Sequence, residues 1–258
     1  MKQYTPLSEK TRAIILGSLL GDGSLKIHYS YKNARFSFRH SIKQKNYFYW
    51  KANQLKEISS DKNIWRQTKN GRDGWGTIKF RYQSAALPAL TEFYRLTHPH
   101  GRFQIRRKWL NLLTPLSLAI WWQDDGSIIA NGRKGVLCTD GFSEKEVKLL
   151  RKYLKKVWRI QTAAASKSKK EPNRLRLWFR SSEQLQSFLR IILPHLVVAD
   201  MIPKFLLLYH NSQLQQRWIS EVSRLSGFSL AKVNYYLHAK QKLWKHYSKY
   251  SENDIVQS

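Results

Sequence analysis

The sequence predicts an α+β fold built from two similar halves and followed by a short helical extension. The first observation is a repeated motif, because an uncharged apolar run ends in Gly-Asp-Gly at 21–23 and another ends in Asp-Asp-Gly at 124–126. Asp22 and Asp125 therefore lie 103 residues apart. The second is that similar strand-like and helix-like segments follow each motif. The third is composition, with 46 Lys and Arg against 17 Asp and Glu in 258 residues.

Composition narrows the class of protein. The 42% of hydrophobic residues is enough for a core in one large domain or two fused ones. The net charge of +29 indicates a polyanionic partner, namely DNA, RNA or an anionic membrane. No apolar stretch is long enough to span a bilayer, and the first residues lack the apolar stretch of a signal peptide. The single Cys138 excludes an internal disulfide framework and a cysteine-based zinc site.

After the first motif, strand and helix signals alternate. Residues 26–40 are polar and aromatic, and the alternation of Arg, Phe, Ser and His over 35–40 predicts a strand. A helix is expected over 43–55, a second strand over 76–82, and a further helix from near Ser84.

The second half repeats this order. Ser143 and Glu146 have the spacing of a capping box, which marks the start of a helix. Residues 167–172 predict a basic loop. The expected elements are a hairpin turn at 132–135, a strand at 136–139, a helix at 143–154, a strand at 173–180 and a helix from near Ser182. The predicted organisation is thus a first half over 1–100, a second half over 101–210 and an extension over 211–258.

The extension has no counterpart in the first half. Residues 219–237 predict two short helices joined at Gly227, which is helix-turn-helix spacing. Its second helix offers polar side chains to a DNA groove: Lys232, Asn234, Tyr235 and His238. Its apolar residues would instead form a small core or dock on the preceding half: Val222, Leu225, Val233 and Leu237. Both interpretations, DNA contact and structural brace, stay open at this point.

The two motifs also predict a catalytic site. Ala13, Gly17 and Gly21 recur every four residues, so the first apolar helix has a stripe of small side chains that allows close approach of another helix. If the two helices pack side by side, Asp22 and Asp125 meet at their C-terminal ends. Adjacent carboxylates repel unless a cation lies between them, and Mg²⁺ prefers such oxygen ligands. In a strongly basic protein this indicates metal-assisted phosphodiester hydrolysis. An isolated Asp-Gly is usually a plain turn after a helix, but two copies at repeat spacing favour a site.

The motifs resemble the two signature sequences of the LAGLIDADG homing endonucleases. Residues 15–23 match the nonapeptide at its central Gly, its Asp and its final Gly, and residues 118–126 match at Leu, Ala, Asp and Gly. The resemblance is to the single-chain, two-motif branch and covers residues 7 to about 210. It implies two pseudo-symmetric αββαββα halves, with eight strands forming a β-saddle over the DNA major groove and the motif helices at their interface.

The resemblance also implies an activity, which is Mg²⁺-dependent cleavage of both strands of a long double-stranded DNA target by a monomer. The usual setting is an intron or intein reading frame, and no intein splicing junction is visible, which favours an intron-encoded or free-standing protein. The expected location is an organelle, either chloroplast or mitochondrion, or a bacterial cytoplasm.

By position, the resemblance makes Asp22 and Asp125 the catalytic metal ligands. It also implies one basic catalytic residue in each half, which is Lys204 in the second half and Arg102 in the first, with Arg106 or Arg107 as alternatives. Asp124 ranks behind Asp125, because the final Asp-Gly aligns with Asp22-Gly23, and is expected to cap the helix or lend a carbonyl. Seven basic residues on predicted strands are candidates for DNA binding: Arg35, Arg39, Lys79, Arg81, Arg174, Arg176 and Arg180.

Two other functions compete with site-specific DNA cleavage. An RNA-binding intron maturase or splicing cofactor on the same fold would explain the charge equally well, with intron RNA as its partner. A transcription factor that uses only the C-terminal helix-turn-helix would leave the repeat unexplained. Loss of either motif Asp would favour the maturase, and both are present.

Overall fold

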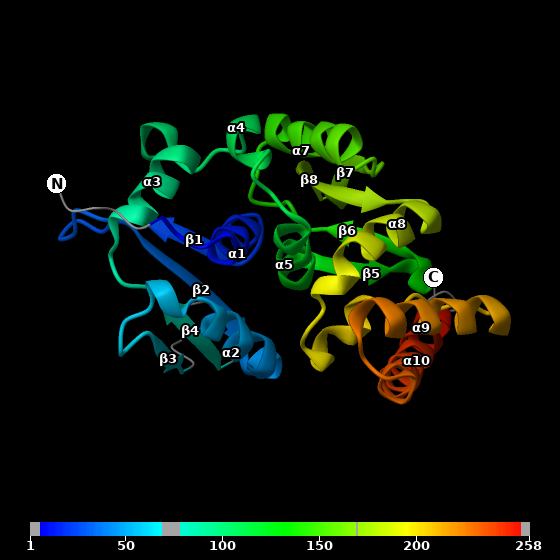
Figure 1. Ribbon diagram of the computed structural model, residues 1–258. Helices are drawn as coiled ribbons and strands as arrows, with labels where there is room; N and C mark the ends of the chain where they lie inside the picture. The colour runs from blue at the N-terminus through cyan, green and yellow to red at the C-terminus, as the bar shows by residue number, and fades with distance from the viewer. Residues whose placement is uncertain (1–5, 69–77, 169, 254–258) are drawn as a thin grey trace.

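The computed structural model describes residues 6–68, 78–168 and 170–253 and shows two α+β halves side by side (Figure 1). Each half contains a four-stranded antiparallel sheet, and the strand orders β1-β2-β4-β3 and β5-β6-β8-β7 correspond one to one. The predicted α+β class and the repeat are therefore confirmed. No helix in these ranges combines the length and the hydropathy needed to cross a membrane.

The first half follows the order expected from the sequence. Its helices and strands are α1 (Glu9–Leu19), β1 (Gly23–Lys26), β2 (Arg35–Ser41), α2 (Lys45–Gln54), β3 (Ile64–Gln67), β4 (Lys79–Gln83) and α3 (Pro88–Thr97). The last helix starts later than predicted. Ser84 still continues the pairing of β4 with β2, since its N–H donates to Phe36 O at 2.8 Å, and Pro88 then supplies the first helical residue. The start of the strand predicted over 76–82 lies outside the described residues.

The connector and the second half contain α4 (Arg107–Leu110), α5 (Pro115–Asp125), β5 (Gly126–Ile129), α6 (Ala130–Arg133), β6 (Lys134–Leu137), α7 (Glu144–Val157), β7 (Ala163–Ser168), β8 (Glu171–Phe179) and α8 (Ser182–Ile192). The predicted capping box is present, because Glu146 accepts from the N–H of Ser143 at 2.8 Å.

Two local predictions in the second half were wrong. The hairpin turn lies at 130–133 rather than 132–135, because Gly132 has the positive φ of 73° while Gly135 already pairs with Phe179 in the sheet. The basic loop predicted at 167–172 is mostly the facing ends of β7 and β8, where Lys167 and Glu171 form an ion pair at 2.8 Å. Residue 169 lies outside the described residues.

The motif helices α1 and α5 pack against each other at the centre of the molecule (Figure 1). A Cβ atom at Gly17 would lie 2.3 Å from the carbonyl oxygen of Ser117, and one at Gly21 would lie 2.5 Å from Cβ of Asp124. Both distances are shorter than any real contact, so only glycine permits this separation of the helices. The stripe of small residues predicted from the sequence is thus the contact surface, and it brings the two motif ends together.

The extension forms α9 (Ser212–Ser226) and α10 (Leu230–Asn253), joined by Gly227 with a φ of 76°. Its buried residues Val222, Val233 and Leu237 belong to the same core cluster as the second half. The Trp218 indole donates to Phe205 O at 3.0 Å, and Lys240 Nζ donates to the carbonyls of Pro203 and Leu206, both at 2.7 Å. These contacts favour the brace interpretation over a separate DNA-reading module.

Substitution of Gly17 by Ala tests the packing of the motif helices. We expect the free energy of unfolding to fall by about 1–3 kcal/mol, because the added methyl group meets the Ser117 carbonyl in a closely packed contact. Chemical denaturation of the Gly17→Ala protein measures this. Gly141→Ala is the matched control, since nothing lies within 4 Å of a Cβ at that position. Equal stability of the two variants would contradict the proposed tight contact.

Removal of the extension after Tyr209 tests its role. We expect a lower melting temperature, since the apolar contacts of Trp218, Val222 and Leu237 with the second half are lost. The DNA footprint of the shortened protein should keep its length. The double substitution Lys232→Gln with His238→Gln, on the exposed side of α10, is the control and should change neither quantity. A footprint shortened at one end by either change would instead identify a DNA-contacting extension.

Candidate active site

The two motif aspartates lie where the paired helices end. Asp22 follows α1 in a short turn, and its side chain is 40% exposed. Asp125 is the last residue of α5 and is half-buried. The C-terminal end of a helix carries partial negative charge from its unpaired carbonyls, so two such ends beside two carboxylates concentrate negative charge at one point.

Lys204 closes the end of α5. It lies at the end of a short 3₁₀ segment, Ala199–Lys204, and its Nζ donates to the carbonyls of Gln123 at 2.6 Å and Asp124 at 3.2 Å. In return, the Trp122 indole of α5 donates to the Lys204 carbonyl at 3.0 Å. The residue predicted as the second-half basic group is therefore at the motif end. Burial lowers the pKa of Lys204 below its usual value, against the charges of the nearby aspartates, which raise it.

Asp124 has a larger role than the sequence suggested. Its carboxylate is fully buried and accepts from Lys51 Nζ at 2.7 and 3.0 Å, from Tyr47 Oη at 2.9 Å and from the backbone N–H of Asp22 at 3.3 Å. Its backbone carbonyl also accepts a hydrogen bond from Lys204 Nζ, as expected from the sequence. His40, equally buried, lies between the two acids, with Nδ1 3.3 Å from Asp22 Oδ2 and Nε2 3.8 Å from Asp124 Oδ1.

Sequence analysis missed His40, Tyr47 and Lys51, although a signal existed for two of them. In the alternating strand 35–40, His40 lies on the same face as Phe36 and Phe38, so it occupies a core position. Lys51 lies four residues after Tyr47 on the buried side of α2, where an unpaired lysine would be costly. In the strand and in the helix, a polar residue thus occupies a position that the sequence pattern assigns to the core, which indicates a buried polar network.

Charge around the two motif carboxylates is unequal. Burial would raise the pKa of Asp22, but the hydrogen bond and charge of His40, with the charges of Lys51 and Lys204, bring it below the usual value. Burial and then the charges of Asp22 and Asp124 raise the pKa of Asp125 to about 7, because Lys204 and Lys51 compensate only in part. The protein therefore stabilises the charged form of Asp22 and disfavours the charged form of Asp125.

These residues fit a divalent cation. Ligand atoms of Asp22, His40 and Asp124 lie within 4.8 Å of one another, but both Asp124 oxygens already accept hydrogen bonds from Lys51. Asp22 is exposed, and Asp125 lies close enough for the two carboxylates to interact electrostatically, so these two side chains would be the ligands of a metal bound here. The donor set of two carboxylates at helix ends matches what Mg²⁺ takes from proteins.

The structure leaves Arg102, Arg106 and Arg107 on the exposed connector. The cationic groups that act on Asp22 are His40, Lys51 and Lys204, and none of the three arginines is among them. The structure thus does not bring Arg102 to the carboxylates, and its catalytic role stays a prediction.

The predicted DNA-binding residues of the first half share one face of its sheet. Arg39 pairs directly with Arg81, and Arg35 pairs with Lys26, which places their side chains on the side opposite the buried Phe36 and Phe38. The strands β1 to β4 contain no acidic residue. Lys79 pairs with Ser41 on the same open face.

The second sheet carries fewer cations on its open face. Arg174 and Arg176 alternate with the core residues Leu175 and Leu177, and Arg180 follows the strand in an exposed position. Arg176 is held by Asp140, with its Nε 2.8 and 3.1 Å from the two carboxylate oxygens. The open faces of the two sheets therefore differ in their exposed charge.

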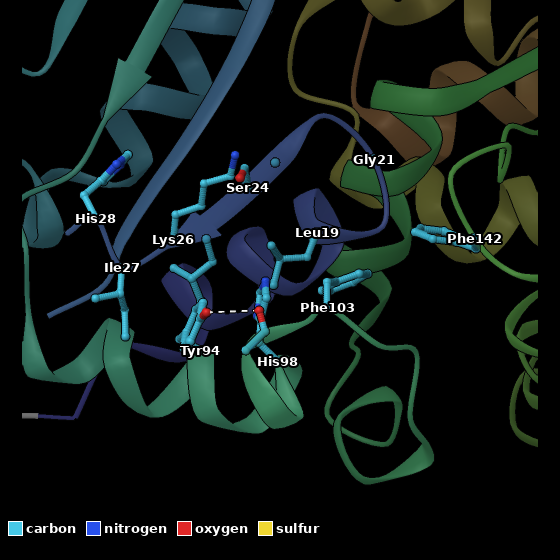
Figure 2. Close-up of a pocket in the computed structure, with 13 residues that line it drawn as sticks. Leu19, Gly21, Ser24, Lys26, Ile27, His28, Tyr94, His98, Phe103 and Phe142 are labelled. Carbon is cyan, nitrogen blue, oxygen red and sulfur yellow. Dashed lines mark hydrogen bonds between the residues drawn. The ribbon is translucent and has the colours of Figure 1, made fainter.

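A cavity of about 560 Å³ lies beside the end of the first motif helix. Figure 2 shows the residues that line it. Leu19, Lys26, Tyr94 and His98 from the first half line it, and Phe142 reaches it from the second half. None of Asp22, Asp125 and Lys204 lines this cavity, so it is distinct from the carboxylate centre.

Comparison with known proteins agrees with this geometry. The model of the LAGLIDADG DNA endonuclease family matches residues 12–185. The Protein RecA of Mycolicibacterium fallax is 29% identical over 220 residues, which are 77% of this chain and 48% of that protein. The cytochrome b mRNA maturase bI2 of Saccharomyces cerevisiae is 28% identical over 200 residues, 74% of this chain and 46% of that protein. The chain thus spans about half the length of these curated relatives.

Among solved structures, the homing endonuclease I-WcaI bound to its DNA recognition sequence superposes with a TM-score of 0.68. The two chains are 22% identical, and the match covers 81% of this chain and 91% of the other. This similarity shows the shared fold. The family match, which spans most of the chain and both motifs, shows that the chain belongs to the LAGLIDADG DNA endonuclease family.

Substitution of Asp125 by Asn tests the raised pKa of this carboxylate. The pKa of Asp125 is higher in the folded than in the unfolded protein, so its contribution to stability is lost as pH rises from about 4 to about 7. In metal-free buffer, the Asp125→Asn protein should gain melting temperature relative to the natural chain over this range and keep that gain above pH 7. Asp22→Asn is the control, and its melting temperature should fall relative to the natural chain, because the pKa of Asp22 is lowered in the folded protein. If the melting temperatures of all three proteins changed with pH in parallel, the raised pKa of Asp125 would be refuted.

Proposed function

We propose that this chain is a site-specific homing endonuclease that makes Mg²⁺-dependent double-strand breaks at a long DNA target. The observation that carries the proposal is the pair Asp22 and Asp125, which lie at the ends of the two packed motif helices next to Lys51 and Lys204. The family match and the two open sheet faces support it.

In this reaction Asp22 and Asp125 would hold the metal, which supplies an activated water and neutralises charge on the phosphate. Lys204 holds the end of α5 and keeps Asp125 in place through the carbonyls of Gln123 and Asp124. The two carboxylates come from two halves related by repeat, which suits the two antiparallel strands of a duplex.

Binding would depend on the two sheets. Cations on the open face of the first sheet, with Arg174, Arg176 and Arg180 of the second, would contact phosphates and base edges. Because both halves lie in one chain, the protein would act as a monomer on a target without twofold symmetry. Similarity to a maturase supports an origin within an intron.

Substitution of either motif carboxylate tests this function. Asp22→Asn and Asp125→Asn should each abolish double-strand cleavage, because one metal ligand is lost, while DNA affinity changes little, since phosphate contacts supply most of it. The measurement is cleavage, with Mg²⁺, of DNA that spans a candidate intronless junction, alongside a binding titration in EDTA. Cleavage at the natural rate by either variant would exclude the assignment.

A second candidate function, RNA binding as an intron maturase, is favoured by one surface. The buried residues of α7 include Val147, Leu150 and Leu154, which face the sheet, so its charged residues face away from the DNA-binding side. There, a groove of about 720 Å³ contains six cations and no acid among its lining residues. These cations are Lys148, Arg151, Lys152, Lys155, Lys156 and Arg159. Such a surface fits a phosphate backbone separate from the one on the sheets.

Charge removal on α7 separates the two functions. The variant with Arg151, Lys152, Lys155 and Lys156 all changed to Gln should lose affinity for a labelled RNA hairpin at least tenfold and keep DNA cleavage, because the sheet faces are intact. The control changes Arg39 and Arg81 to Gln and should show the reverse. Equal losses for RNA and DNA in both variants would mean that the α7 surface has no separate role.

A further inference from the structure

A buried polar network connects the second motif helix to the first half. Asp124 and Lys51 are both fully buried, and Lys51 reaches both carboxylate oxygens. Tyr47 donates a third hydrogen bond, and the backbone N–H of Asp22 a fourth. An isolated buried carboxylate would be very unfavourable, so these donors are what allow Asp124 to lie between the halves.

The network continues from Asp124 to the catalytic carboxylate through His40. The His40 side chain has no exposed surface, and its ring lies against Tyr47 and Phe38, with centroids 5.0 and 5.4 Å away. Within the described residues, the carboxylates that form ion-pair contacts with its two nitrogens are those of Asp22 and Asp124. A ring fixed by packing on both sides holds its Nδ1 at one point, 3.3 Å from Asp22 Oδ2.

Among the residues of the second half that the structure describes, no equivalent network is present. Asp124 precedes its motif aspartate, and the residue at the same place in the first motif is Gly21. A side chain at Gly21 would overlap Asp124, so the interface has room for only one acid. The asymmetry is therefore a consequence of the close helix contact.

The position that corresponds to His40 is also different. The motif glycines Gly23 and Gly126 pair with Phe38 and Leu137, so the counterpart of His40 is Thr139. Its hydroxyl donates to Leu175 O at 2.6 Å rather than to a motif carboxylate. On α7, the helix that corresponds to α2, no lysine or arginine is buried.

We propose that Lys51, Tyr47, Asp124 and His40 are positioning residues that act more directly on Asp22 than on Asp125, so that the two DNA strands depend on them unequally. This inference rests on the proposed endonuclease function. If each motif carboxylate serves the nearer of the two scissile phosphates, loss of the network displaces one reacting centre and leaves the other intact. A displacement of about 1 Å is enough for a loss on the order of a hundredfold in rate.

The decisive variant is His40→Phe, which keeps a stacked ring and removes both nitrogens. Thr139→Val, at the corresponding place in the second half, is its matched control. The substrate is a duplex selected by cleavage with the natural protein from a randomised DNA library, labelled on one strand or the other. We expect His40→Phe to slow cleavage of one strand at least tenfold, with less than a threefold change on the other, so that a supercoiled plasmid accumulates as nicked circle.

Two further measurements make the result independent of folding. Tyr47→Phe removes only one hydrogen bond and should show the same strand preference with a smaller effect. The rise in melting temperature on addition of Mg²⁺, without DNA, should be smaller for His40→Phe than for the natural protein and unchanged for Thr139→Val, because a displaced Asp22 binds the metal less well.

The outcomes are distinct. If the natural protein cleaves no duplex in the library, the proposed function fails. If it cleaves and His40→Phe slows both strands equally or neither, with Thr139→Val showing the same pattern, the network is merely structural and the inference is overturned.

Discussion

The close contact between α1 and α5 is the constraint on which the rest of the structure depends. With Gly17 against the Ser117 carbonyl and Gly21 against Asp124, the two helix axes approach to a separation that no other residue allows. This contact joins two halves whose sheets are otherwise separate, and it sets both motif ends at the same level. Two carboxylates from distant parts of the chain then face the same space, together with two negative helix ends.

Such a concentration of negative charge has to be compensated by the surrounding protein. Lys51 neutralises Asp124, and Lys204 binds the last carbonyls of α5, so both lysines are held by the charge that they offset. At Asp125, burial and the charges of Asp22 and Asp124 outweigh the two lysines and raise its pKa to about 7. A cation bound beside Asp125 would stabilise the charged form of this carboxylate.

The sequence was sufficient for the architecture and for the meeting of the two motif ends, because both depend on local patterns. The 103-residue repeat predicted the two halves, and the glycine spacing predicted the helix contact. Elements that depend on strand pairing were harder to predict from the sequence. Ser84 looked like a helix start but bonds to Phe36 across the sheet, and residues 167–172 looked like a loop because their strand pairing is not local. His40 and Lys51 were missed because their partner, Asp124, is more than seventy residues away in the chain.

The buried pair of Lys51 and Asp124 also shows why a repeated fold need not have a symmetric centre. Burial of an ion pair contributes little net stability, because desolvation offsets most of the Coulomb attraction. Its geometric requirement is strict, however, since either charge without the other is strongly destabilising. A pair that crosses from α2 to α5 therefore fixes one half against the other in a single register. Because Gly21 leaves space for one acid only, that register can be fixed from one side alone, and the same contact that makes the halves equivalent in fold makes them unequal at their centre.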